Sequence, residues 1–178
     1  GIQGIGIHIL SSENVEANEV TVEGSEESNV IVESSSTGMS ISNSLIGWSE
    51  ESGIIVRQGS DFFEMSHVNI ENNEDYGCLF ASNGATIFNS QIYNNGLNGI
   101  YLQSINEADL SNNEFEGNGL SEVKVLSSYD VNIGENYFNA TNFEGGGWGI
   151  DISSSSESEI KNNFFELGVR LTGSDNFT

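Results

Sequence analysis

The strongest constraint on this chain is a short motif that recurs along its whole length. A Gly-apolar-x-apolar tetrapeptide begins at Gly6, Gly53, Gly77, Gly99, Gly149 and Gly168, and copies without the glycine begin at Asn29 and Glu122. The starts lie 19 to 27 residues apart. Units of this length cannot bury a hydrophobic face alone, so they must stack on one another to form a continuous core.

Each motif start is followed by a second block, in which two apolar residues five positions apart enclose a polar, asparagine-rich pair. We place its copies at Val15–Val20, Ile41–Ile46, Met65–Ile70, Ile87–Ile92, Leu110–Phe115, Ile133–Phe138 and Ile160–Phe165. Asparagine tolerates the left-handed backbone region that a sharp bend requires, and stacked asparagines can hydrogen-bond between layers. The block therefore predicts a bend between short strands, repeated once in every coil.

No segment shows the sustained 3.6-residue hydrophobic period of a helix. The coils "GIYLQS…LSNNEF" and "GIDISS…IKNNFF" resemble the right-handed parallel β-helix repeat family, the pectate-lyase-like superfamily that includes NosD-type and carbohydrate-binding or sugar-hydrolase repeats. The resemblance implies an all-β, single-stranded right-handed solenoid of about seven to eight coils, a single domain over residues 1–178. It implies no particular activity, because that superfamily includes lyases, hydrolases, epimerases, tailspikes, adhesins and surface-layer proteins. The competing architecture, a leucine-rich repeat, would need a leucine-dominated motif and helices.

The charge balance narrows the range of partners. The chain carries 27 acidic and 4 basic residues, a formal net charge of -23. This charge repels nucleic acids and anionic membrane surfaces, and it leaves metal ions, polycations and neutral glycans as candidate partners. Since no apolar run approaches the length of a membrane span, we predict no membrane insertion. The single cysteine, Cys78, excludes an internal disulfide and is typical of a small core residue.

Alternation along the first strand of each coil separates core residues from outward-facing ones. The predicted core positions are Ile7, Ile9, Val30, Val32, Ile54, Val56, Cys78, Phe80, Ile100, Leu102, Val123, Val125, Ile150, Ile152, Val169 and Leu171. The residues between them form what we call the outward ladder: His8, Ile31, Ile55, Leu79, Tyr101, Lys124, Asp151 and Arg170. Its apolar half is typical of a contact surface, unless loops of the same chain cover it. In enzymes of the resembled superfamily, this face lines the substrate groove.

We take the ladder positions from Ile31 to Arg170 as the contact-face candidates. Two cations flank Asp151 there and should keep it ionised, which favours a salt-bridged ladder over a general acid. With no second acid on this face, we predict no catalytic residue. The two tryptophans, Trp48 and Trp148, could each stack on a sugar ring or cover the core.

Three carboxylates, Glu107, Asp130 and Glu157, occupy the same relative position in consecutive coils. Hard cations such as Ca2+ bind clustered carboxylate oxygens, so a Ca2+ site is one interpretation and a solvated acidic face is the other. We predict no other cofactor. Two sequons, beginning at Asn139 and Asn176, would accept glycans if the protein is secreted.

Two functions remain open at this stage. The sequence begins and ends within the repeat, so we expect a segment of a longer chain or a subunit that assembles end to end. The first hypothesis is an extracellular or cell-surface structural or adhesive protein, such as a filament, surface layer or stalk, which binds copies of itself or adjacent domains. The second is a polysaccharide-binding or polysaccharide-degrading domain, a lyase or hydrolase, that uses the face formed by Tyr101, Lys124, Asp151 and Arg170.

Overall fold

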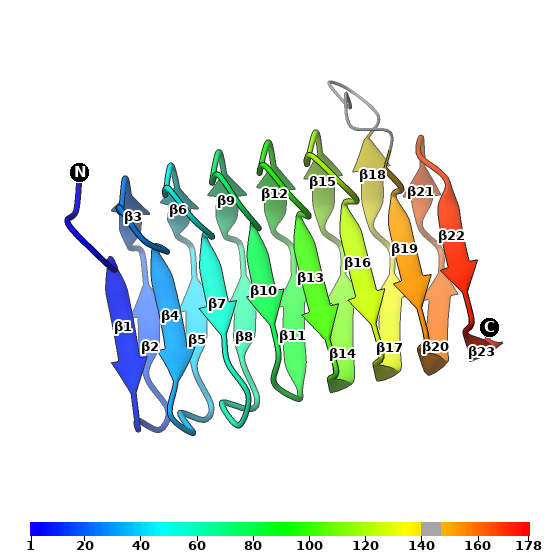
Figure 1. Cartoon of the computed structure of the whole chain (residues 1–178), viewed down its shortest axis with the longest axis horizontal. Helices are drawn as coiled ribbons and strands as arrows, with labels where there is room; N and C mark the ends of the chain where they lie inside the picture. Colours follow the sequence, from blue (N-terminus) through cyan, green and yellow to red (C-terminus); the bar gives the residue numbers. More distant parts are fainter. Residues whose placement is uncertain (140–146) are drawn as a thin grey trace.

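The computed structural model describes residues 1–139 and 147–178, which form an elongated column of stacked coils (Figure 1). Each complete coil contributes one strand to each of three parallel sheets, and neighbouring strands in a sheet come from consecutive coils. This arrangement confirms the all-β solenoid that the repeat predicts. No helix in the described ranges has the length and apolar character needed to cross a membrane.

The strands are distributed over the sheets as follows. The first sheet contains β1 (Ile7–Leu10), β4 (Val30–Glu33), β7 (Ile54–Val56), β10 (Cys78–Phe80), β13 (Ile100–Gln103), β16 (Val123–Leu126), β19 (Ile150–Ser153) and β22 (Val169–Thr172). The second contains β2 (Glu16–Asn18), β5 (Ser40–Ser42), β8 (Glu64–Ser66), β11 (Ala85–Phe88), β14 (Asn106–Ser111), β17 (Tyr129–Gly134), β20 (Ser156–Lys161) and β23 (Asp175–Phe177). The third contains β3 (Thr21–Glu23), β6 (Leu45–Gly47), β9 (Asn69–Glu71), β12 (Gln91–Tyr93), β15 (Glu114–Glu116), β18 (Tyr137–Asn139) and β21 (Phe164–Phe165).

The core fills the inside of the column with equivalent residues stacked coil upon coil. The core positions predicted on the first sheet are buried from Ile9 to Ile152, and Ile7 in the first coil is half-buried. Two predicted core residues, Val169 and Leu171, are instead exposed on β22. They lie in register with Ile150 and Ile152, and β22 is the edge strand of the first sheet within the described residues.

The asparagine-rich block forms the corner between the second and third sheets, as predicted. Its first copy lies two residues later than the sequence pattern indicates, because Ala17 pairs with Ile41 and Val22 pairs with Ile46. The misplacement arose because Val15, which is exposed, is more apolar than the true inward residue Ala17. Farther along, Phe115 and Phe138 stack inside the column with ring centroids 5.1 Å apart.

The two residues of each polar pair have different structural roles at this corner. The first residue has a positive φ, for example 51° at Asn89 and 54° at Asn112, and its side chain points outward. The second residue is buried: Asn113 Nδ2 donates to Asn136 Oδ1 at 3.1 Å and to the Ile87 carbonyl at 2.9 Å. The first residue therefore makes the bend, and the second forms an amide ladder between coils.

A second amide ladder occupies the corner between the third and first sheets. Asn73 Nδ2 donates to Asn95 Oδ1, and Asn95 Nδ2 donates to Asn118 Oδ1, both at 2.8 Å. This ladder explains the glycine of the repeat motif. A Cβ atom on Gly77 would lie 2.9 Å from Asn95 Nδ2 and 2.5 Å from the Gly99 carbonyl oxygen, so a side chain would displace the ladder.

Candidate functional site

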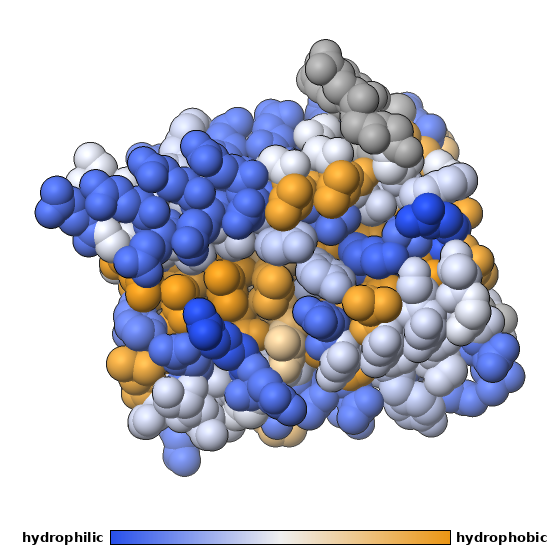
Figure 2. Space-filling view, in the orientation of Figure 1, coloured by the Kyte–Doolittle hydropathy of each residue, from blue (hydrophilic) through white to orange (hydrophobic). Residues whose placement is uncertain are grey.

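The structure confirms the outward ladder as a continuous row on the outer face of the first sheet. Each predicted neighbour is a register partner, in the pairs His8 with Ile31, Ile31 with Ile55, Ile55 with Leu79, Leu79 with Tyr101, Tyr101 with Lys124, Lys124 with Asp151 and Asp151 with Arg170. Figure 2 shows this face, where a band of hydrophobic surface crosses the N-terminal half of the column.

The ladder is less exposed than predicted. Ile31 retains 5% of its accessible surface and Asp151 retains 3%, whereas Ile55, Leu79 and Tyr101 are half-buried. Side chains in adjacent coils lie about 4.8 Å apart and cover one another's flanks. The apolar stripe is therefore a narrow, partly covered band.

A compact ion-pair cluster forms the charged half of the ladder. Asp151 Oδ2 accepts from Lys124 Nζ at 2.5 Å, and the guanidinium of Arg170 donates from Nε to Oδ1 at 2.9 Å and from a terminal nitrogen to Oδ2 at 2.6 Å. Lys124 Nζ also donates to Ser153 Oγ at 2.8 Å. The bidentate Arg170 contact fixes both the carboxylate and the guanidinium plane.

The electrostatics of this cluster oppose a role for Asp151 as a proton donor. Burial alone would raise the pKa of the Asp151 carboxyl, but hydrogen bonds from Arg170 and Lys124, together with their charges, outweigh it and lower the pKa below its ordinary value. The carboxylate is therefore ionised at neutral pH, and its oxygens are occupied by cationic donors. This agrees with the predicted salt-bridged ladder.

Aromatic side chains enclose the cluster and form a pocket of about 370 Å³. Tyr76 and Tyr101 face each other on one side, with ring centroids 5.4 Å apart and planes tilted by 35°. On the other side the Arg170 guanidinium lies over the ring of Trp148, 5.6 Å from its centroid. Burial, and then the neighbouring Tyr76, raise the pKa of the Tyr101 hydroxyl, so this hydroxyl stays protonated and can donate a hydrogen bond.

Two pocket residues, Tyr76 and Trp148, are absent from the ladder that the sequence predicts. Both lie just before a strand of the first sheet, and their place beside the ladder depends on how each turn folds. Trp148 is anchored by its backbone, which donates to Ser121 Oγ at 3.4 Å and accepts from the Glu122 amide at 3.0 Å. The other tryptophan, Trp48, is exposed and does not line this pocket.

The predicted cation site receives little support from the geometry. Glu107 and Asp130 line one hollow of about 330 Å³, but Glu157 does not line it, and its Oε1 accepts from Asn176 Nδ2 at 2.6 Å. In the described part of the chain, no group of three or more His, Cys, Asp or Glu residues is placed to hold a metal ion. All three residues have positive φ, which gives them a structural role at a bend. Ca2+ binding stays a prediction.

The two sequons also stay predictions. Asn176 is exposed near the end of the chain. The sequon of Asn139 continues into residues 140–141, which lie outside the described ranges, and Asn139 Nδ2 contacts Glu116 Oε2 at 3.4 Å.

Comparison with known proteins establishes the family. Residues 5–165 match the model of the right handed beta helix region, so the chain belongs to this right-handed β-helix family. No curated protein sequence matches the chain.

Several solved structures share the fold. The periplasmic alginate epimerase AlgG superposes with a TM-score of 0.73 at 16% identity, over 98% of this chain and 47% of that one. DFA-IIIase from Arthrobacter chlorophenolicus A6 gives a TM-score of 0.77 at 13% identity, over 97% and 50%. Tailspike protein 2 of bacteriophage CBA120 gives 0.70 at 13% identity, over 90% and 32%. The chain thus spans half the length of these proteins or less, and the likeness at such identities is one of fold.

Proposed function

We propose that this chain is a polysaccharide-binding β-helix domain, and that the pocket around Tyr101 and Trp148 contacts the sugar. One observation carries the proposal: aromatic rings on two sides enclose a fixed array of cationic donors. Aromatic faces pack against the apolar faces of sugar rings, while Lys124 and Arg170 can donate to hydroxyl or carboxylate oxygens. The alginate epimerase among the structural neighbours is in keeping with this function.

The chemistry of the pocket favours binding over turnover. A hydrolase needs a protonated acid and a second carboxylate at a defined separation, and a carboxylate held ionised by two cations cannot act as that acid. Lys124 and Asp151 instead form a rigid charged floor, because each is fixed by at least two hydrogen bonds. We therefore assign the pocket to recognition and assign no catalytic residue.

The experiment is a glycan array of neutral and uronate-containing polysaccharides, followed by calorimetric titration of the strongest binder. Trp148→Ala and Tyr101→Ala should each weaken binding about fivefold or more, because a buried aromatic anchor typically contributes over about 1 kcal/mol. Tyr129→Ala is the matched control, since Tyr129 is an exposed tyrosine on the second sheet outside the pocket. An array without a binder, or equal affinities for all four proteins, would remove the proposal.

A structural or adhesive role is the second proposal. It is favoured by the exposed apolar side chains of Val169 and Leu171 on β22, which suit packing against a second copy. Light scattering across salt and Ca2+ concentrations tests it, and a monomer under all conditions would oppose it. For either role we propose an extracellular or surface-associated location, as the periplasmic and tailspike neighbours suggest.

A further inference from the structure

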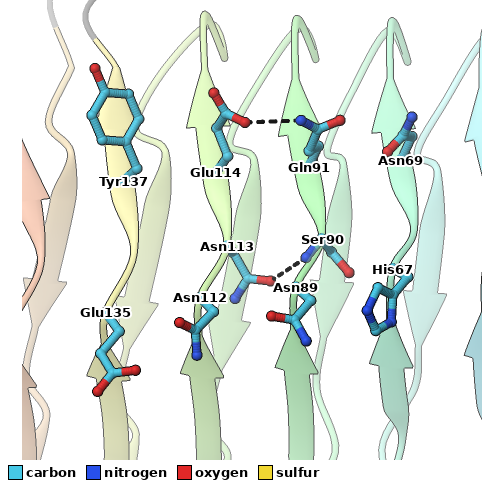
Figure 3. A pocket seen from close by; sticks show the side chains of 10 residues that line it. All are labelled: His67, Asn69, Asn89, Ser90, Gln91, Asn112, Asn113, Glu114, Glu135 and Tyr137. Atoms are coloured by element: carbon cyan, nitrogen blue, oxygen red, sulfur yellow. Dashed lines mark hydrogen bonds between the residues drawn. The ribbon is translucent and has the colours of Figure 1, made fainter.

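A larger groove lies on a different side of the column from the Trp148 pocket. It has a volume of about 800 Å³ and lies along the corner between the second and third sheets. Its lining residues are His67, Asn69, Asn89, Ser90, Gln91, Asn112, Asn113, Glu114, Glu135 and Tyr137. Figure 3 shows most of them in two rows parallel to the column axis, one from His67 to Glu135 and one from Asn69 to Tyr137.

Two of the amide groups that point into this groove, those of Asn89 and Asn112, are not used by the fold, whereas the Gln91 amide donates to Glu114 Oε2 at 2.9 Å. The structural amide of each pair is the buried one, such as Asn113, whose Oδ1 accepts from the Ser90 amide at 3.0 Å. By contrast, the exposed side chains of Asn89 and Asn112 make no hydrogen bond with any described residue. Positive φ explains why asparagine is tolerated at both positions, but it leaves both carboxamides available to a ligand.

The lining restricts the chemistry of that ligand. The carboxamides of Asn and Gln can donate and also accept hydrogen bonds. Sugar hydroxyls have the same two abilities, so the two groups are complementary. None of the ten lining residues is Lys or Arg, whereas Glu114 and Glu135 contribute carboxylates. An anionic chain would be repelled here, so the groove suits an uncharged polyol.

The spacing of the groove suits a linear polymer. Each row offers one polar side chain per coil, and coils repeat at about 4.8 Å, close to the length that one sugar ring adds to an extended chain. At the C-terminal end of one row, Tyr137 stacks on Phe164 with ring centroids 5.0 Å apart and an angle of 11°. This pair is a preformed aromatic platform beside the polar rows.

From these features we infer that the groove is a second carbohydrate site, which binds an uncharged, extended polysaccharide along the column axis. The ligand spans the coils from His67 to Glu135, and its hydroxyls bond to the carboxamides of Asn89 and Asn112. This site is independent of the Trp148 pocket, which has cationic donors and lies on the first sheet.

The test is calorimetric titration with neutral oligosaccharides of about six units, including β-linked glucose, mannose and xylose series. The informative variant is the double substitution Asn89→Gly and Asn112→Gly, because glycine keeps the positive φ and removes only the carboxamides. We expect it to weaken binding at least tenfold. Asn94→Gly is the matched control, because Asn94 also has a positive φ, 55°, but lies at another corner. The affinity of this variant for the oligosaccharide should equal that of the unmodified protein.

The outcomes separate this inference from the function proposed for the first sheet. Trp148→Ala should leave binding in the groove intact, and loss of binding in that variant would assign the sugar to the other pocket and overturn the inference. It is also overturned if no neutral oligosaccharide binds, if only cationic or anionic polymers bind, or if the double glycine variant binds like the unmodified protein. Circular dichroism of each variant confirms that the solenoid is folded.

Discussion

Glu122 is a buried acid at a position where most copies of the repeat have glycine. Its side chain has no accessible surface. Its Oε2 accepts from Asn118 Nδ2, while Oε1 has no hydrogen-bond partner among the described residues. Burial raises the pKa of the carboxyl from 4.5 to about 7, against the hydrogen bonds from Asn118 and the Gly117 backbone. Glu122→Gln keeps the shape of the side chain and removes its titration.

The direction and size of the effect follow from linkage between protonation and folding. Because the pKa of Glu122 is higher in the folded protein, the folded state holds this proton more tightly than the unfolded chain does. The corresponding stability is fully present below pH 4.5, declines as the pH rises, and is lost above about pH 7. Since one pKa unit corresponds to 1.36 kcal/mol, the loss is about 3 kcal/mol. The free energy of unfolding of Glu122→Gln should therefore equal that of the unmodified protein near pH 4.5. At pH 8 it should be higher by up to about 3 kcal/mol.

The assay is urea unfolding of both proteins at several pH values between 4.5 and 8. Repulsion among the many other carboxylates lowers the stability of every form as the pH rises, so the measured quantity is the difference between variant and unmodified protein. Glu16→Gln, which removes one exposed carboxylate, controls for the lost charge and should give a nearly constant difference. Parallel stability curves for Glu122→Gln and the unmodified protein would refute the reasoning.

Two further predictions concern the core. Phe115→Ala should lower the free energy of unfolding by about 3–5 kcal/mol, because it leaves a cavity beside Phe138. Phe62→Ala is the control, since the Phe62 side chain is 63% exposed. It should change the free energy of unfolding, measured by the same urea experiment, by less than about 1 kcal/mol. The buried Cys78 thiol, whose pKa is raised by burial, should react with a thiol reagent only on unfolding, and rapid labelling of the native protein would contradict its place in the core.

The register of the first sheet could be predicted from sequence because the repeat leaves little freedom. Every coil places one residue at each equivalent position of the sheet. A shift of one residue would turn the core side chains of that strand to the outer face. The spacing of motif starts was therefore enough to place Tyr101, Lys124, Asp151 and Arg170 in one row. The same reasoning failed at Val15, where the inward residue is a small alanine that carries little hydrophobic signal.

The walls of the pocket could not be predicted in this way. Tyr76 and Trp148 precede first-sheet strands in turns of different length, and strand alternation does not specify how a turn packs over a neighbouring face. The burial of Ile31 and Asp151 was missed for a related reason, since it depends on side chains in adjacent coils. The sequence also could not show which residue of an asparagine pair makes the bend and which joins the amide ladder, because both are asparagine. Only the backbone conformation distinguishes them.

The exceptions to the repeat carry information of their own. Where the motif glycine is absent, the side chain joins the amide ladder: Asn29 Nδ2 donates to Asn73 Oδ1 at 3.2 Å, and Glu122 accepts from Asn118. A carboxylate can only accept hydrogen bonds, so within the described residues Glu122 is the final acceptor of a ladder whose amides donate toward the C-terminal end of the column. The backbone of Glu122 bonds to Trp148. The aromatic wall of the pocket is therefore attached to the column at Glu122, the last ladder residue that the described ranges contain.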